Sequence, residues 1–246
     1  MRIVRFDHRG RVAHGVLDGD TVDVLAGRPH DPLRSTGQRV PLDEVRLLAP
    51  VTPGLLVGMA RNTGPADRAL PPRSFLKPPG SVIGPRDPIP VPAGIGRVDA
   101  EAELAVVIGR TARGLTGADA LRVVLGYTVA NDVTARDLQQ CDPLWTQAKG
   151  YDGFTPVGPW IDTRFDADAA DVVLLVGDEQ VRGNTADLGR GVAEILVHLT
   201  SFLTLHPGDV VLTGAPGTFA SITPGDLVTA SVEGLGTLSN PAEELA

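Results

Sequence analysis

Two glutamates, Glu101 and Glu103, open a run of aliphatic residues that ends at Gly109. The β-branched content and the terminal glycine predict a strand over residues 98–109. On a strand, residues two positions apart point to the same face, about 6.6–6.8 Å apart along the axis. Buried carboxylates so close repel each other and lose hydration. This costs free energy unless a positive group, such as a divalent cation, lies between them. The alternative is two surface glutamates at an exposed strand start.

A third acid, Asp132, follows an apolar stretch that predicts a second buried strand over residues 127–133. An acid at the end of such a strand also needs a partner. Together with Glu101 and Glu103 it offers three hard oxygen ligands and leaves other positions of an octahedron to water or substrate. This donor set fits Mg²⁺ or Mn²⁺, with Ca²⁺ as a further option.

Other catalytic patterns are absent from the sequence. The five histidines and the single Cys141 show no paired spacing typical of zinc ligands. The chain has no G-x-S-x-G, P-loop or G-x-G-x-x-G motif. Cys141 has no histidine nearby to activate it, and His198 lies at the flank of a helical apolar stripe, typical of a boundary residue.

Composition narrows the classes of function. With 246 residues and 42% hydrophobic content, the chain can bury one large core, with or without a small appendage. The net charge of −8 and the lack of a basic run argue against nucleic acid or anionic membranes as partners. A charged N-terminus, the lack of a long apolar run and a single cysteine predict a soluble, cytoplasmic protein.

The 29 glycines and 21 prolines are spread along the chain, which predicts many short strands and more sheet than helix. We expect a small β-rich region over residues 1–50, built as a strand meander, and a main domain over residues 51–246. The apolar period predicts one clear helix over residues 189–205, and Thr116 could cap a short helix over residues 117–125. The turn-rich segment 59–73 is either a surface loop or a mobile lid.

Several motifs in order resemble the fumarylacetoacetate hydrolase superfamily, over about residues 55–241. They are Phe75-Leu76-Lys77-Pro78, Glu101-Ala102-Glu103-Leu104, Asn131-Asp132-Val133-Thr134-Ala135-Arg136-Asp137, Trp145-Thr146-x-Ala148-Lys149, Gly158-Pro159-Trp160 and Pro207-Gly208-Asp209-Val210-x-Leu212-Thr213-Gly214. The resemblance implies a mainly β (α+β) fold, a mixed β-sandwich roll with a few helices and a small N-terminal region. It also implies a homodimer, and Mg²⁺ or Mn²⁺ bound by Glu101, Glu103 and Asp132.

The same resemblance implies roles for residues around the metal. Lys149 would transfer protons or stabilise an oxyanion, and Gln139 would orient water or substrate. Arg136 would pair with a carboxylate of the substrate or of the metal's surroundings; the alternative is a structural ion pair with Asp137 or Asp152. Thr213 would lie near the substrate.

Members of the superfamily act on small 2-oxo and 1,3-dicarbonyl acids through a metal-stabilised enolate. Because acylpyruvate-type hydrolysis is the commonest activity in the family, our first expectation is C–C bond hydrolysis of the acylpyruvate or fumarylacetoacetate type. Hydrolytic members, however, commonly carry a histidine and a glutamate in the lid. Residues 59–67 contain neither, and Ala215 replaces a common threonine. These departures favour decarboxylation or isomerisation, with Arg61 or Asp67 taking over part of the lid's role and Arg61 as a candidate for substrate binding. A catalytically inactive binding protein is the remaining alternative.

Overall fold

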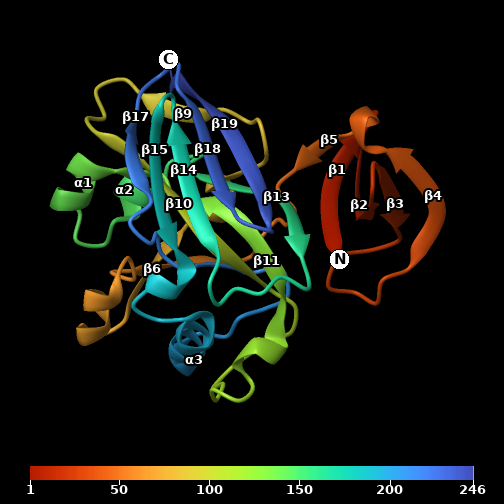
Figure 1. Cartoon of the computed structure of the whole chain (residues 1–246), viewed down its shortest axis with the longest axis horizontal. Helices are drawn as coiled ribbons and strands as arrows, with labels where there is room; N and C mark the ends of the chain where they lie inside the picture. Colours follow the sequence, from red (N-terminus) through yellow and green to blue (C-terminus); the bar gives the residue numbers. More distant parts are fainter. Residues whose placement is uncertain (246) are drawn as a thin grey trace.

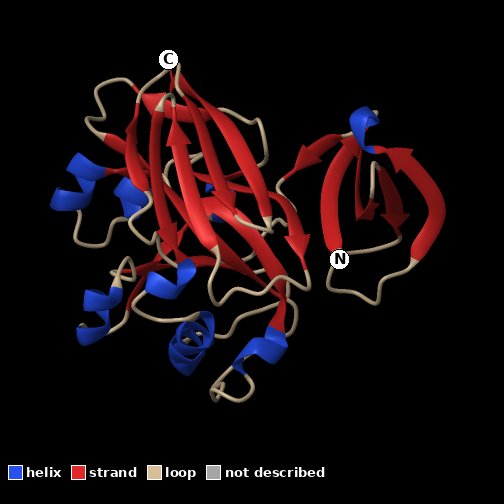
Figure 2. Cartoon of the chain, in the orientation of Figure 1, coloured by secondary structure: helices blue, strands red, loops and turns tan. Residues whose placement is uncertain are grey.

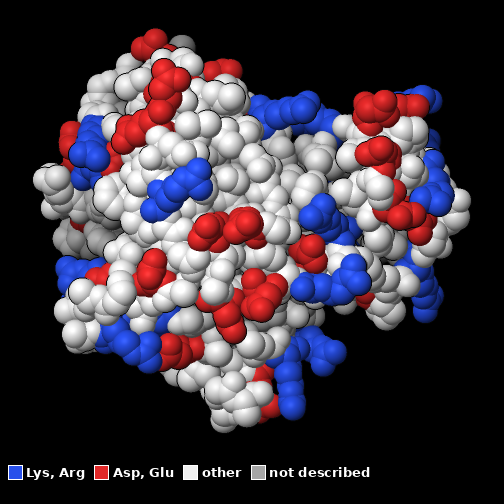
Figure 3. All heavy atoms as spheres, viewed as in Figure 1, with Lys and Arg blue, Asp and Glu red and all other residues white. Residues whose placement is uncertain are grey.

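The computed structural model describes residues 1–245, and most of its ordered elements are β-strands (Figures 1 and 2). The mainly β fold with few helices that the sequence predicted is confirmed. In Figure 1 the N-terminal strands form a small lobe beside the larger body that contains the rest of the chain. On the face shown in Figure 3, acidic and basic side chains are interspersed over both lobes.

The larger sheet runs through both lobes. Its main path, in spatial order, is β4 (Ser35–Pro41), β3 (Thr21–Leu25), β2 (Arg11–Asp18), β1 (Arg2–His8), β13 (Thr155–Asp162), β11 (Val124–Asn131), β10 (Val98–Ile108), β16 (Val210–Leu212), β6 (Leu56–Ala60) and β7 (Arg73–Lys77). Four short strands pair with this path from the side: β5 (Arg46–Leu48), β8 (Val82–Ile83), β12 (Thr134–Ala135) and β17 (Phe219–Ile222).

A second sheet covers one face of the first and consists of five strands. Their order is β15 (Glu179–Asn184), β14 (Asp171–Val176), β18 (Leu227–Val232), β19 (Gly236–Leu245) and β9 (Ile89–Pro92). The inward apolar residues of both sheets pack together, and Leu104, Leu174 and Leu238 belong to this shared core. The body is therefore a sandwich of two sheets.

The N-terminal lobe is the expected strand meander. β1, β2 and β3 pair antiparallel in sequence order, and glycines with positive φ lie in the two turns, Gly10 at +82° and Gly19 at +58°. β1 also pairs with β13 through Arg2 and Ile3, so the lobe extends the main sheet.

Strand β10 is the centre of the body, and all eleven of its residues are buried. It pairs with β11 and β16 along its second half and with β12 and β17 at its start. Because side chains alternate along a strand, Ala100, Ala102 and Leu104 face the core between the sheets, and the odd-numbered residues face the other way.

The helices are short: α1 (Arg136–Cys141), α2 (Thr146–Lys149) and α3 (Val192–Phe202). Five 3₁₀ turns accompany them: η1 (Leu42–Glu44), η2 (Pro65–Ala69), η3 (Pro79–Ser81), η4 (Ala120–Val123) and η5 (Thr185–Asp187). The predicted apolar face of α3 is confirmed, since Ile195, Leu196 and Leu199 are buried. None of the helices in the described part of the chain is long and apolar enough to cross a membrane.

The predicted helix over residues 117–125 is wrong: only the 3₁₀ turn η4 forms there. Val124 already belongs to β11, where it lies opposite Ile108 of β10. Backbone pairing with the central strand outweighs the weak local helix preference of these residues.

Candidate metal centre and active site

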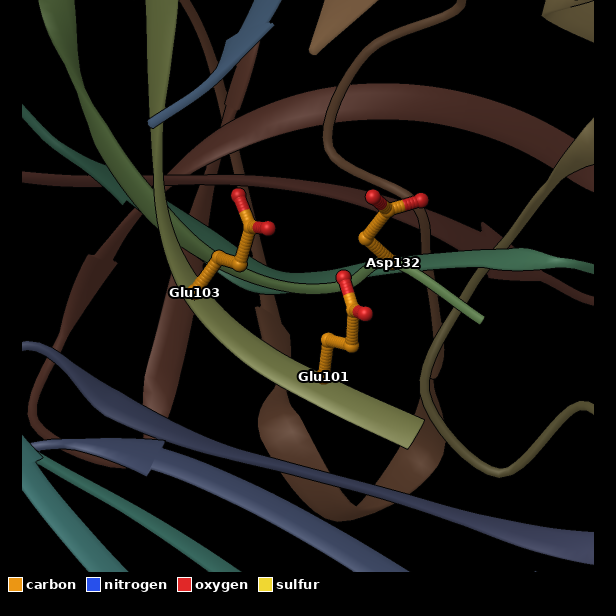
Figure 4. A group of neighbouring side chains, drawn as sticks. All are labelled: Glu101, Glu103 and Asp132. Carbon is orange, nitrogen blue, oxygen red and sulfur yellow. The ribbon is translucent and has the colours of Figure 1, made fainter. Parts of the chain in front are cut away.

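Three carboxylates converge as the sequence predicted. Glu101 and Glu103 project from one face of β10, and Asp132 follows β11, the antiparallel neighbour of β10 (Figure 4). One carboxylate oxygen from each lies within 4.8 Å of the others. The residues are only 9%, 2% and 1% exposed, respectively, so the cluster is not an acidic patch on the surface.

Two buried lysines neutralise Asp132. Lys149, the last residue of α2, donates to Asp132 and, at 3.2 Å, to Oε2 of Glu101. Lys77, at the end of β7, donates to Oδ1 of Asp132 at 2.6 Å and to the carbonyl oxygens of Val133 and Phe154. Three acceptors use all three protons of the Lys77 ammonium group.

Lys77 was not among the predicted site residues, although it belongs to one of the motifs. Its signal is the alternation of β7: Lys77 lies two residues after Phe75, so the two share a buried face. A lysine on such a face needs a carboxylate partner. The ring of Phe75 also lies 4.6 Å from Nζ of Lys149, a cation–π distance.

Arg136, the first residue of α1, joins two acids of β10. Its Nε donates to Oδ2 of Asp99 at 2.8 Å, and its terminal nitrogen forms an ion pair with Glu101. Asp99 is 1% exposed and also binds Arg97. The alternative of an ion pair between Arg136 and Asp137 or Asp152 is wrong: within residues 1–245 its ion-pair partners are Asp99 and Glu101.

The strand period also indicates Asp99, because Asp99, Glu101 and Glu103 occupy alternate positions on one face of β10. Asp99 was not among the predicted site residues. The contacts show its part, which is to hold the arginine that contacts Glu101.

Glu103 has no cation among its described contacts. Oε2 accepts a hydrogen bond of 2.7 Å from the backbone N–H of Gly214. Burial, together with the charges of Asp132 and Glu101, raises the pKa of Glu103 well above its ordinary value. Burial acts the same way on Asp132, but the ammonium groups of Lys149 and Lys77 outweigh it and lower the pKa of Asp132. A cation is therefore needed most beside Glu103.

The donor set fits a divalent hard cation. All three ligand candidates offer carboxylate oxygens, and no histidine or cysteine of residues 1–245 belongs to the cluster. Mg²⁺, Mn²⁺ and Ca²⁺ prefer oxygen ligands, and a positive ion would relieve the repulsion that raises the pKa of Glu103.

The other predicted site residues lie in different settings. Gln139 is half-buried on α1, and its Oε1 accepts from Arg136 at 3.0 Å. Thr213 is fully buried, and its hydroxyl donates to the carbonyl oxygen of Leu104 at 2.8 Å. Arg61 is exposed, with a φ of +54°, and its side chain forms no hydrogen bond or ion pair within residues 1–245.

The segment between β6 and β7 is fastened at its base. Asn62 is fully buried and donates to the carbonyl oxygens of Thr213 and Arg190 at 2.7 and 3.0 Å. Gly214, with a φ of +104°, packs so closely on this base that a Cβ would lie 2.3 Å from the backbone oxygen of Asn62. The segment thus reaches the metal centre through Gly214, whose N–H binds Glu103.

Asp67 is the single acid of residues 61–72, and its hydrogen bonds lie within the segment itself. Its carboxylate accepts from the backbone N–H and the hydroxyl of Thr63 at 2.8 and 2.9 Å. The backbone hydrogen bond from Thr63 lowers the pKa of Asp67. A carboxylate held in this way is a poor base for activating water.

Two protein-family models match this chain. Residues 55–242 match the family model described as fumarylacetoacetate (FAA) hydrolase C-terminal, and residues 1–50 match one described as Rv2993c-like, N-terminal. Protein Rv2993c of Mycobacterium tuberculosis is 40% identical over 262 residues, covering 98% of this chain and 97% of that protein.

Solved structures of similar proteins carry names of more than one reaction. The 2-hydroxyhepta-2,4-diene-1,7-dioate isomerase from Mycobacterium marinum is 38% identical with a TM-score of 0.94, covering 99% of this chain and 98% of that one. The maleylpyruvate hydrolase from Sphingobium sp. SYK-6, solved with manganese(II) and pyruvate, is 29% identical with a TM-score of 0.85 over the full length of both chains. With a matching family model over most of its length and a buried acidic triad, the chain belongs to the fumarylacetoacetate hydrolase family.

Proposed function

We propose that this protein is a divalent-metal-dependent enzyme that converts small 2-oxo or 1,3-dicarbonyl carboxylic acids through an enolate. The observation that carries the proposal is the buried triad of Glu101, Glu103 and Asp132 with three cationic side chains around it. A Mg²⁺ or Mn²⁺ bound there would act as a Lewis acid toward two oxygens of the substrate and stabilise the negative charge of the enolate. The similar maleylpyruvate hydrolase, solved with manganese(II) and pyruvate, supports this chemistry.

Lys149 is the side chain best placed to hold a proton at the centre. Burial opposes its charge, but the carboxylates of Asp132 and Glu101 outweigh burial and raise the pKa of Lys149. The ammonium form therefore persists at neutral pH and can donate a hydrogen bond, or a proton, to a substrate oxygen that becomes negative.

The two α1 residues have supporting roles in this proposal. Arg136 holds Glu101 in position from Asp99, and Gln139, whose Oε1 binds Arg136, presents its amide nitrogen as a donor. The hydroxyl of Thr213 already donates to the carbonyl oxygen of Leu104. Thr213 therefore shapes the site through its backbone, next to Gly214. Arg61, exposed on the lid segment, would bind the carboxylate of the substrate.

We infer that the enolate is protonated without hydrolysis, as in an isomerase or a decarboxylase of oxaloacetate type. The observation behind this choice is the segment between β6 and β7. It contains no histidine or glutamate, and its Asp67 accepts hydrogen bonds from Thr63. The similarity to the isomerase from Mycobacterium marinum agrees with it.

C–C bond hydrolysis of an acylpyruvate is the second candidate. It is supported by the similarity to maleylpyruvate hydrolase over the full chain. This reaction needs a water activated by a group other than the lid pair of the hydrolytic relatives. Lys149 carries a raised pKa and is a poor base, so we rank hydrolysis second.

Metal removal and product analysis test both parts. The purified protein is treated with EDTA, reloaded with Mg²⁺ or Mn²⁺, and mixed with oxaloacetate or an acylpyruvate, and NMR identifies the products. We expect metal-dependent turnover that Glu103→Gln abolishes at the same metal concentration while circular dichroism shows an unchanged fold. Full activity without metal would overturn the proposal of a metal-dependent enzyme. Lack of turnover of every 2-oxo acid would favour the alternative of a catalytically inactive binding protein.

A further inference from the structure

A second polar cavity lies between the N-terminal lobe and the body, away from the metal centre. Its volume is about 370 Å³, enough for a small molecule. The side chains that line it include four that can carry positive charge and no carboxylate: Arg5, His14, Arg28 and His30. Thr52 and Pro207–Gly208 complete the wall from the side of the body.

The arrangement of the four cationic side chains is set by the fold. Arg5 of β1 and His14 of β2 are direct cross-strand partners, and like charges in such positions destabilise a sheet. Arg28 and His30 come from the loop between β3 and β4, and His30 lies close to Gly208. The lobe therefore brings together groups that repel each other when charged.

These side chains have few partners within residues 1–245. The one side-chain hydrogen bond of Arg5 runs to the carbonyl oxygen of Ala49 at 3.4 Å, and Arg28 forms none. Nδ1 of His30 is buried and has no hydrogen-bond partner. A buried nitrogen of this kind costs free energy unless a ligand or water binds it.

The nearest acids do not neutralise the cluster. Asp31 accepts from the backbone N–H of Arg28 at 3.0 Å, and Asp209 accepts from the backbone N–H groups of Leu55 and His206. Burial and the charge of Arg5 lower the pKa of His14 to about 4, and no acid is among the causes. The cavity lining therefore carries cationic and neutral side chains but no carboxylate, in a chain whose net charge is −8.

We propose that this cavity is a binding site for a small anion that carries a carboxylate or phosphate group. Arg5 and Arg28 supply charged donors of the kind that bind such groups, and a ring N–H of His14 or His30 can donate one further hydrogen bond. An anion there would accept a hydrogen bond from Nδ1–H of His30 and offset the charges of Arg5 and Arg28.

This site is separate from the metal centre. It lies at the starts of the parallel strands β6 and β16, next to Thr52 and Gly208. The metal centre lies past the other ends of these strands, where Gly214 binds Glu103. Five residues of β6 span about 16 Å, so a small anion cannot reach both sites.

Calorimetric titration of the full chain in EDTA tests the proposal, with inorganic phosphate in one arm and succinate in the other. The Glu103→Gln variant is titrated in parallel to exclude binding at the metal centre. Arg28→Gln and His30→Gln remove contacts at the site, and Arg34→Gln, an exposed arginine of the same loop that does not line the cavity, is the matched control.

We expect at least one anion to bind the wild type, Glu103→Gln and Arg34→Gln equally, and Arg28→Gln to weaken this binding about tenfold or more. The imidazole NMR signals of His14 and His30 should shift during the titration. The arm that binds more tightly identifies the ligand as phosphate-like or carboxylate-like. Lack of binding of both anions at about 10 mM, or equal affinities of Arg28→Gln and Arg34→Gln, would overturn the proposal.

Discussion

The two halves of strand β10 are equally buried but chemically opposite. On one face, the first half presents Asp99, Glu101 and Glu103, and the second half presents Ala105 and Val107. The aliphatic half packs into a core cluster that includes Ile3 and Ile161, and needs no partner other than apolar atoms. The acidic half is contacted by Lys149 and Arg136, and Lys77 pairs with the neighbouring Asp132.

The difference shows how burial should be interpreted in this protein. Apolar burial stabilises the second half at roughly 25 cal/mol per Å² of area removed from water. In the first half, burial is unfavourable, and specific charges offset its cost. A strand with both kinds of burial places a reactive, water-poor site directly against a rigid core.

The largest difference between the halves should appear in activity. Glu103→Gln removes a proposed metal ligand, and we expect turnover to fall by roughly 100-fold or more, beyond the effect typical of residues that only orient ligands. Val107→Ala, on the same face of the same strand, should leave turnover per folded molecule unchanged. Steady-state kinetics at saturating Mn²⁺ measures both. Equal losses in the two variants would mean that the acidic half has no special chemical role.

The next effect is on stability. Lys77→Met leaves the carboxylate of Asp132 with one partner fewer in a buried site, and we expect a loss of about 3–5 kcal/mol in the metal-free protein. Val107→Ala deletes buried methyl groups and should cost about 2 kcal/mol. Urea unfolding in EDTA compares the two variants. If Lys77→Met costs no more than Val107→Ala, charge compensation of Asp132 is not what stabilises the acidic cluster beside β10.

Arg136 and Arg97 contact the same buried acid, Asp99, from different depths. The side chain of Arg136 is 22% exposed and also contacts Glu101, whereas that of Arg97 is 55% exposed. We expect Arg136→Gln to weaken metal affinity about 10–100-fold, and Arg97→Gln to change it by less than about twofold. Titration with Mn²⁺, followed by electron paramagnetic resonance, measures the affinities. Similar losses in both variants would contradict a specific role for Arg136.

The last effect is a pH dependence of the metal-free protein, which appears as a slope rather than as a single difference. Because the pKa of Glu103 is raised above its ordinary 4.5, the folded state binds this proton more tightly than the unfolded state. The contribution of Glu103 to stability is complete below pH 4.5 and is lost as the pH rises through the raised pKa. We expect the wild type to lose up to about 1.4 kcal/mol per pH unit relative to Glu103→Gln.

Urea unfolding of both proteins in EDTA, from pH 5 to pH 8, measures this slope. A difference in unfolding free energy that stays constant over the range would mean that the pKa of Glu103 is not raised. Added Mn²⁺ should reverse the trend, since the metal binds the ionised carboxylate.

The acidic triad could be predicted from the order of the amino acids alone. The period of two in a β-strand follows from backbone geometry, so Glu101 and Glu103 had to share a face wherever the strand lay. Asp132 was predicted as the third ligand because an acid at the end of a buried apolar strand is unfavourable without a partner. The clearest helix, α3, was also predictable, because Ile195, Leu196 and Leu199 repeat with the helical period.

Which charged side chains contact one another depends on the three-dimensional fold. Lys77 reaches Asp132 across 55 residues, Arg136 binds Asp99 across 37, and Arg5 faces His14 through strand register. The predicted helix over residues 117–125 does not form for the same reason. Pairing of Val124 with Ile108 outweighs the local helix preference of these residues. Local periods are set by covalent geometry, whereas contacts across the chain depend on how distant strands pair and pack.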